Sequence, residues 1–76
     1  MDNREELKKL YKSVFGVEIN DENKDLSFKK IGVNSLQVVE LLVAIQENMG
    51  YDLYDSDVDL MKLRTFSQVL DAINNL

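Results

Sequence analysis

The sequence contains no Cys, His, Trp or Pro, and the missing Cys and His remove whole classes of chemistry. Without Cys there is no disulfide, no thiol nucleophile and no Cys-ligated zinc, and without His there is no imidazole base and no His-ligated metal. A chain of 76 residues also has room for only one small hydrophobic core. We therefore expect one domain, residues 1–76, without Cys- or His-based chemistry.

The chain also lacks a long apolar segment and an excess of positive charge. Its N-terminus, from Met1 to Glu6, is charged where a secretion signal would be apolar, and its longest apolar run is 41–45. Fourteen acidic against nine basic residues give a net charge of −5, which disfavours binding to a phosphate backbone. We expect a monomer in the cytoplasm, with no membrane or nucleic-acid partner.

Charge is unevenly placed, because residues 31–61 hold six acids and none of the nine bases. This stretch is either a solvated acidic face or a docking surface for basic partners. Asp55, Asp57 and Asp59 alternate as at the start of a calcium loop. An EF-hand then needs Gly and Glu where this chain has Leu60 and Phe66, so we expect no metal site.

Apolar residues recur at helical spacing in three segments, the first of which predicts a helix over about residues 3–15. Asp2 and Glu5 have the spacing of a capping box at its start, and Gly16 follows its end. Residues 16–34 form a long loop, which we expect to be ordered because apolar anchors flank its polar middle. These anchors are Val17, Ile19, Leu26, Phe28 and Ile31.

The second segment predicts a helix from about Leu36 to Met49, with Asn34 or Ser35 as its N-cap and Gly50 at its end. Nine of its fourteen residues are apolar, more than a single buried stripe requires. The outer side is therefore either a recognition face or part of a more deeply buried helix. Helical spacing directs inward Val38, Leu41, Leu42, Ile45 and Met49, and outward Leu36, Gln37, Glu40, Val43 and Glu47.

The third segment predicts a last helix that begins at Thr65, which has capping-box spacing to Gln68. Its predicted buried residues are Phe66, Val69, Leu70 and Ile73. A short helical turn over Asp55 to Met61 is expected before it. We predict an all-α fold, an antiparallel bundle of three principal helices plus one short helix.

The segment 31–36, Ile-Gly-Val-Asn-Ser-Leu, places a Ser hydroxyl at the start of the second helix. A phosphate attached there would be stabilised by backbone N–H groups and the helix dipole. The alternative is that Ser35 is a plain N-cap. Helix polarity alone does not separate Ser35 from Ser67, which lies in the first turn of the last helix.

The sequence resembles acyl carrier proteins and the related peptidyl carrier domains. Their signature is Leu-Gly-x-Asp-Ser-Leu at the head of the second helix, and Gly32, Ser35 and Leu36 keep this register. Val39-Glu40-Leu41 and the helix-ending Gly50 also stand where carriers place such residues. The likeness covers essentially the whole chain.

The resemblance implies that Ser35 carries 4′-phosphopantetheine, which a phosphopantetheinyl transferase adds from coenzyme A. The protein would then hold acyl or aminoacyl intermediates as thioesters for loading and processing enzymes, and would itself be no catalyst. The docking residues implied for these partners are Asn34, Leu36, Gln37, Glu40, Val43 and Glu47.

The chain departs from fatty-acid carriers at Asn34, where they usually have Asp, and at Gln37, Gln46 and Asn48, where they tend to be acidic. These features resemble carriers of polyketide or nonribosomal peptide assembly more than those of fatty-acid synthesis. A fatty-acid carrier and an unmodified helical interaction module with the same fold are the alternatives. Because the chain starts at Met1 and ends just after the last helix, we expect a free-standing carrier.

Overall fold

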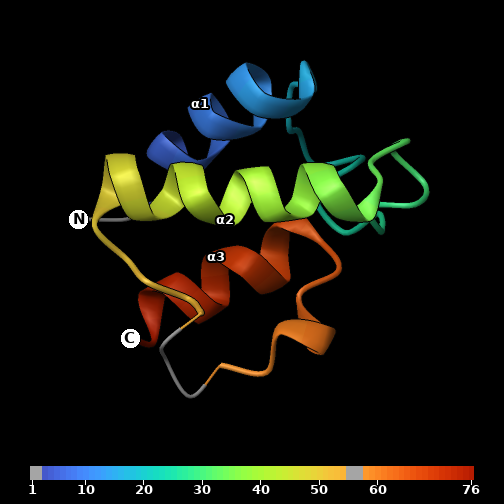
Figure 1. The fold of residues 1–76 in the computed structure, drawn as a ribbon. Helices are drawn as coiled ribbons and strands as arrows, with labels where there is room; N and C mark the ends of the chain where they lie inside the picture. The colour runs from blue at the N-terminus through green and yellow to red at the C-terminus, as the bar shows by residue number, and fades with distance from the viewer. Residues whose placement is uncertain (1–2, 55–57) are drawn as a thin grey trace.

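The computed structural model describes residues 3–54 and 58–76, and the regular structure in this part of the chain is entirely helical. The three principal helices are α1 (Arg4–Phe15), α2 (Ser35–Met49) and α3 (Phe66–Asn74). A 3-10 turn, η1 (Leu60–Lys62), stands between α2 and α3 (Figure 1). The predicted all-α fold with three principal helices and one short helix is confirmed.

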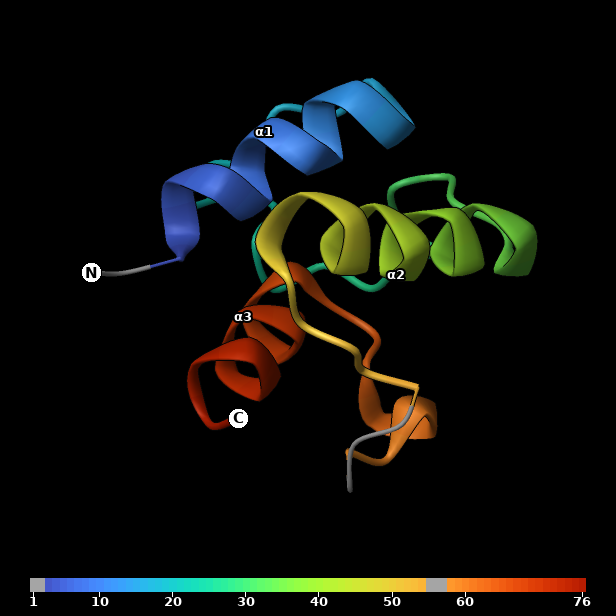
Figure 2. The same ribbon diagram turned by 60° about the vertical axis from the view of Figure 1, so that its left-hand side comes forward.

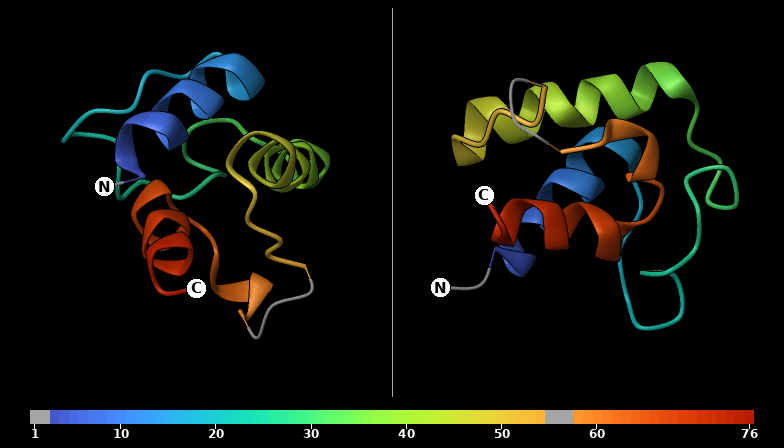
Figure 3. Two further views of the ribbon diagram at one scale, coloured as in Figure 1. Left: turned by 90° about the vertical axis from the view of Figure 1, so that its left-hand side faces the viewer. Right: turned by 90° about the horizontal axis from the view of Figure 1, so that it is seen from below.

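The directions of the helices follow from the connections between them. α1 and α2 are antiparallel, as predicted. The predicted antiparallel order does not extend to α3, which runs in the same general sense as α2, because the segment that carries η1 crosses back along the molecule (Figures 1 and 2). Seen nearly end-on to α2, the three helices stand at the corners of a triangle (Figure 3, left). Each helix therefore turns one face to a shared interior and another to solvent.

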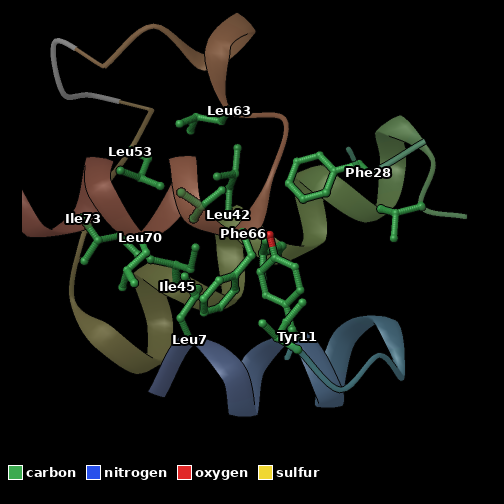
Figure 4. Packing of buried hydrophobic residues seen from close by; sticks show 14 residues of the cluster. Leu7, Tyr11, Phe28, Leu42, Ile45, Leu53, Leu63, Phe66, Leu70 and Ile73 are labelled. Atoms are coloured by element: carbon green, nitrogen blue, oxygen red, sulfur yellow. The ribbon is translucent and has the colours of Figure 1, made fainter. Parts of the chain in front are cut away.

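The shared interior is filled by aliphatic and aromatic side chains (Figure 4). All four predicted core residues of α3 are buried, and on α2 the predicted inward residues are buried or half-buried. The core residues are Leu7, Tyr11, Ile19, Phe28, Val33, Leu41, Leu42, Ile45, Leu53, Leu63, Phe66, Val69, Leu70 and Ile73. The helical periodicity of the sequence therefore predicted the buried faces correctly.

Tyr11 lies at the centre of an aromatic group in this core. Its ring meets the ring of Phe15 edge-on at 5.0 Å between centroids and that of Phe66 at 5.1 Å. The Tyr11 hydroxyl is buried and has no hydrogen-bond partner among the described residues. Burial raises the pKa of Tyr11, so the hydroxyl stays neutral.

Two details at helix starts differ from the predictions. The N-cap residue of α1 is Asn3, whose side chain bonds the Tyr51 hydroxyl (3.3 Å) and the Asn74 side chain (2.9 Å) instead of capping the helix. Asp2, the predicted cap, lies outside the described residues. Among the described residues the short helix begins at Leu60, because the Asp59 carboxylate accepts the Met61 amide (3.0 Å) and caps the turn there. Asp55 and Asp57 lie outside the described residues.

The long loop between α1 and α2 is ordered by its own polar side chains and by its anchors. The Asn20 side-chain oxygen accepts the amides of Glu22 (2.8 Å) and Asn23 (3.0 Å), which closes the polar middle into a turn. The predicted anchors Ile19 and Phe28 are buried, but Leu26 is exposed, and its prediction as an anchor was wrong. Leu26 lies just after this closed turn, where its side chain meets solvent.

Candidate functional site

A tight turn over residues 27–33 leads into α2. Within it the Val33 amide donates to the Phe28 carbonyl oxygen (2.8 Å) and the Gly32 amide to the Lys29 carbonyl oxygen (3.2 Å). Gly32 has a φ of 82°, a left-handed conformation that side-chain-bearing residues rarely adopt. The side chains of Phe28 and Val33 are buried, so the turn is fixed to the core on both sides of this glycine.

A reciprocal capping box starts α2 immediately after the turn. The Gln37 amide donates to Asn34 Oδ1 (2.9 Å), and the Asn34 amide donates to Gln37 Oε1 (3.0 Å). Of the two predicted caps, Asn34 is therefore the correct one, and Ser35 is the first residue of the helix. The interpretation of Ser35 as a plain N-cap is wrong.

The Ser35 side chain therefore does not cap the helix. The residue is exposed, and its hydroxyl makes no hydrogen bond to the residues that the structure describes. The first turn of α2 contains no acidic residue. An exposed alcohol at the positive end of a fifteen-residue helix is suited to carry a phosphate ester, because amides and helix dipole both favour the negative charge.

The predicted docking residues mostly face solvent along α2. Leu36 is 68% exposed and Val43 41%, and Glu40 and Glu47 are exposed as well. Asn34 is exposed, but its side chain caps the helix together with the half-buried Gln37, so these two have a structural role. The outer side of α2 is therefore a solvent-facing surface and not part of a more deeply buried helix.

Sequence reasoning missed Val39, which is 41% exposed. Its position, three residues after Leu36 and four before Val43, makes these three side chains an exposed apolar stripe on successive turns of α2. The helical spacing of these three residues could have indicated that they share a face. The sequence did not show which face of α2 the other helices cover.

Ser67, the competing serine, has a different environment at the start of α3. Its amide donates to the Lys24 carbonyl oxygen (3.1 Å). Its hydroxyl, together with the Lys24 ammonium, holds the pKa of the Asp25 carboxylate below its usual value. Ser67 is therefore engaged in fixing the long loop to α3.

The described residues offer no evidence for the other site chemistries weighed from the sequence. Within residues 3–54 and 58–76, no three carboxylates are grouped so that they could hold a metal ion. Among the same residues, no helix combines the length and the apolar character needed to cross a bilayer.

Comparison with known proteins bears on what an exposed serine at this position is for. Residues 5–73 match the family model described as "Phosphopantetheine attachment site". The chain belongs to this family of phosphopantetheine carriers. The family is not catalytic: its members carry covalently attached groups for other enzymes.

Two curated relatives agree with this assignment. Acyl carrier protein 2 of Pseudomonas aeruginosa is 36% identical over 68 residues, which cover 88% of this chain and 84% of the relative. The acyl carrier protein of Buchnera aphidicola subsp. Schizaphis graminum is 34% identical over 70 residues, covering 91% and 86%. The comparison with solved structures found no match.

Proposed function

We propose that Ser35 is the residue of this carrier to which 4′-phosphopantetheine is attached, within a carrier domain that spans residues 1–76. The observation that carries the proposal is the capping box of Asn34 and Gln37, which leaves an exposed Ser35 hydroxyl without a hydrogen bond to the described residues. The Gly32-x-x-Ser35-Leu36 context supports it, because it keeps the register of the carrier signature.

The attachment is a phosphoryl transfer at the Ser35 oxygen. Ser35 Oγ forms a phosphodiester, the phosphoanhydride bond of coenzyme A breaks, adenosine 3′,5′-bisphosphate leaves, and the hydroxyl proton passes to a base of the transferase. The attached group supplies a thiol, which this Cys-free chain lacks, and the thiol holds acyl groups as thioesters. The chain contributes a rigid, exposed attachment point at a helix end that favours the phosphate charge.

Intact mass spectrometry tests this proposal. The purified chain is incubated with coenzyme A, Mg²⁺ and a promiscuous phosphopantetheinyl transferase, and we expect a mass increase equal to one phosphopantetheinyl group. Fragmentation should place the added mass on Ser35. An unchanged mass, or a modified residue other than Ser35, contradicts the proposal.

For the pathway, we favour polyketide or nonribosomal peptide assembly over fatty-acid synthesis, in the cytoplasm. The support is the neutral character of Asn34, Gln37, Gln46 and Asn48 around α2, where fatty-acid carriers tend to be acidic. The names of the two curated relatives favour acyl over aminoacyl cargo. Elongation of the malonyl-loaded carrier by a fatty-acid synthesis system, at a rate equal to that of its own carrier, would instead assign the chain to that pathway.

Loading and processing enzymes are proposed to dock on the outer side of α2, where Leu36, Val39 and Val43 provide apolar contact and Glu40 and Glu47 provide charge. Glu40→Lys should slow association with a basic loading enzyme, and high salt should reduce the difference. Glu6→Lys on α1 makes the same charge change at another exposed position and serves as the control. Equal association rates for both variants would remove Glu40 from the docking surface.

A further inference from the structure

Basic residues gather at the end of the molecule where α2 begins. Lys29 and Lys30 lie in the turn that leads to Ser35, and Lys62 and Arg64 lie in η1 and the segment before α3. We call these four residues, Lys29, Lys30, Lys62 and Arg64, the basic cluster. Figure 3 (right) shows the start of α2, the preceding turn and η1 at the same end of the molecule.

Backbone hydrogen bonds hold the two parts of the basic cluster beside each other. Phe28, the residue before Lys29, donates its amide to the carbonyl oxygen of Arg64 (2.8 Å). The Ser67 amide donates to the carbonyl oxygen of Lys24 (3.1 Å), which adds a second connection between the same segments. The cluster is thus a fixed feature of the fold rather than a chance approach of two loops.

The described acids around the basic cluster balance only part of its positive charge. All four members are exposed, and none forms an ion pair within residues 3–54 and 58–76. Of the described acids near it in sequence, Asp25 is paired with Lys24 (3.1 Å), and the carboxylate of the exposed Asp59 accepts the Met61 amide. Among the described residues, the Ser35 end therefore carries more positive than negative charge, on a chain whose net charge is −5.

Exposed apolar side chains occur at the same end of the molecule. Met61 in η1 is 76% exposed and Leu36 in the first turn of α2 is 68% exposed, the two highest values among the large hydrophobic residues described. Protein interfaces combine an apolar centre with a polar or charged rim. This end of the molecule has that composition, which suits a protein partner better than a free anion.

The sign of the charge reverses between the basic cluster and the later turns of α2. Glu40 and Glu47 are exposed further along the helix, and residues 31–61 contain no Lys or Arg. A surface that is positive at one end and negative at the other favours one orientation of an approaching partner, because the opposite orientation brings like charges together.

We propose that the phosphopantetheinyl transferase that modifies Ser35 presents an acidic surface to the basic cluster and apolar side chains to Leu36 and Met61. This inference rests on the proposed function of Ser35. Carboxylates of the transferase pair with Lys29, Lys30, Lys62 and Arg64, and the acids of α2 keep the transferase from docking in the reverse direction. The basic cluster thereby selects the partner and orients it, while taking no part in the chemistry.

The test uses the intact chain and the transferase encoded in the genome of its source organism. The combined variant Lys29→Glu, Lys30→Glu is compared with Lys8→Glu, Lys9→Glu, a lysine pair on α1 that gives the same change in net charge. We expect the KM for the carrier to rise about tenfold in the first variant and to change less than about twofold in the second, with kcat nearly unchanged in both. Raising the salt concentration to about 0.5 M should remove most of the difference.

Further variants separate docking from folding. Lys29→Arg with Lys30→Arg keeps the charge and should restore the wild-type KM, and Lys29→Gln with Lys30→Gln should give an intermediate value. Circular dichroism checks that each variant is folded. If the wild type is not modified at Ser35, the proposed function fails and this inference with it. If the wild type is modified but both glutamate pairs behave alike, or if the Lys29 and Lys30 variant has a lower KM, only this inference is overturned.

Discussion

The starts of α2 and α3 are built from similar sequences and are used differently. Asn34-Ser35-Leu36-Gln37 begins α2 and Thr65-Phe66-Ser67-Gln68 begins α3. In each, the cap side chain accepts the amide of the glutamine three residues on, at 2.9 Å in α2 and 3.1 Å in α3. Each also carries a serine in the first turn, so both offer a hydroxyl at a positive helix end.

The two starts differ in what covers them. The first residue of α2 is the exposed Ser35, whereas the first residue of α3 is Phe66, which is 2% exposed and packs against Tyr11. Ser67 is engaged by the Lys24–Asp25 part of the long loop. A helix N-terminus is therefore not enough to define an attachment site, because the neighbouring segments decide whether its hydroxyl is available.

The largest expected effect is on labelling. Ser35→Ala should abolish transfer of phosphopantetheine from coenzyme A, whereas Ser67→Ala should leave it within about twofold of the wild type, because only the first variant removes the exposed hydroxyl. Intact mass spectrometry of both variants measures the result. Labelling that persists in Ser35→Ala, or is lost in Ser67→Ala, would reverse the roles of the two helix starts.

The second effect is on the free energy of unfolding, which should fall more on substitution at the start of α3 than at the start of α2. Phe66→Ala should lower the free energy of unfolding by about 3–5 kcal/mol, because it removes a buried ring from the core. Leu36→Ala, at the exposed start of α2, should change it by less than about 0.5 kcal/mol. Urea denaturation followed by circular dichroism measures both. Equal midpoints for the two variants would mean that Phe66 is not a core anchor.

A smaller effect separates the cap of α2 from the residue after it. Asn34→Ala should cost about 1 kcal/mol, because it removes one half of the capping box. Ser35→Ala should cost no more than a few tenths of a kcal/mol, since the Ser35 hydroxyl bonds to none of the described residues. The same urea experiment compares them. A larger loss for Ser35→Ala would show that Ser35 is the true cap.

The smallest effect is on the pKa of Asp25, the loop residue whose carboxylate interacts with Ser67 at the start of α3. The Ser67 hydroxyl lowers the pKa of Asp25, so this interaction stabilises the fold above the ordinary Asp pKa, and its contribution is lost as the pH falls through the lowered value. Ser67→Ala should therefore raise the pKa of Asp25 toward its ordinary value, as measured by NMR titration of the carboxyl carbon. Ser35→Ala should leave it unchanged. A pKa of Asp25 that is the same in the wild type and Ser67→Ala would show that Ser67 does not interact with this carboxylate.

The sequence was sufficient for features that depend on local periodicity and capping. The three helices, their buried faces and the stops at Gly16 and Gly50 agree with the structure. The choice between Asn34 and Ser35 as cap remained open, because both residue types cap helices well and only the backbone geometry separates them. Gln37 was assigned to docking, but its side chain closes the capping box.

Features that depend on contacts between distant segments were predicted less well. The sequence contains no signal that the Arg64 carbonyl receives the Phe28 amide, so it did not bring the bases of the loop beside those of η1. The exposure of Leu26 and Val39 also depends on contacts between distant segments, so the sequence did not predict it. The outward side of α2 depends on where α1 and α3 pack, which is a property of the whole fold.

The capping box at the start of α2 also makes the folding of this helix start independent of the modification of Ser35. Because Asn34 and Gln37 satisfy each other's amides, the helix start is complete whether Ser35 bears a hydroxyl or a phosphodiester. On the proposed attachment at Ser35, we therefore expect the unmodified chain to be folded as well as the modified one. Hydrolytic removal of the proposed arm should then leave a folded chain that can be modified again without refolding.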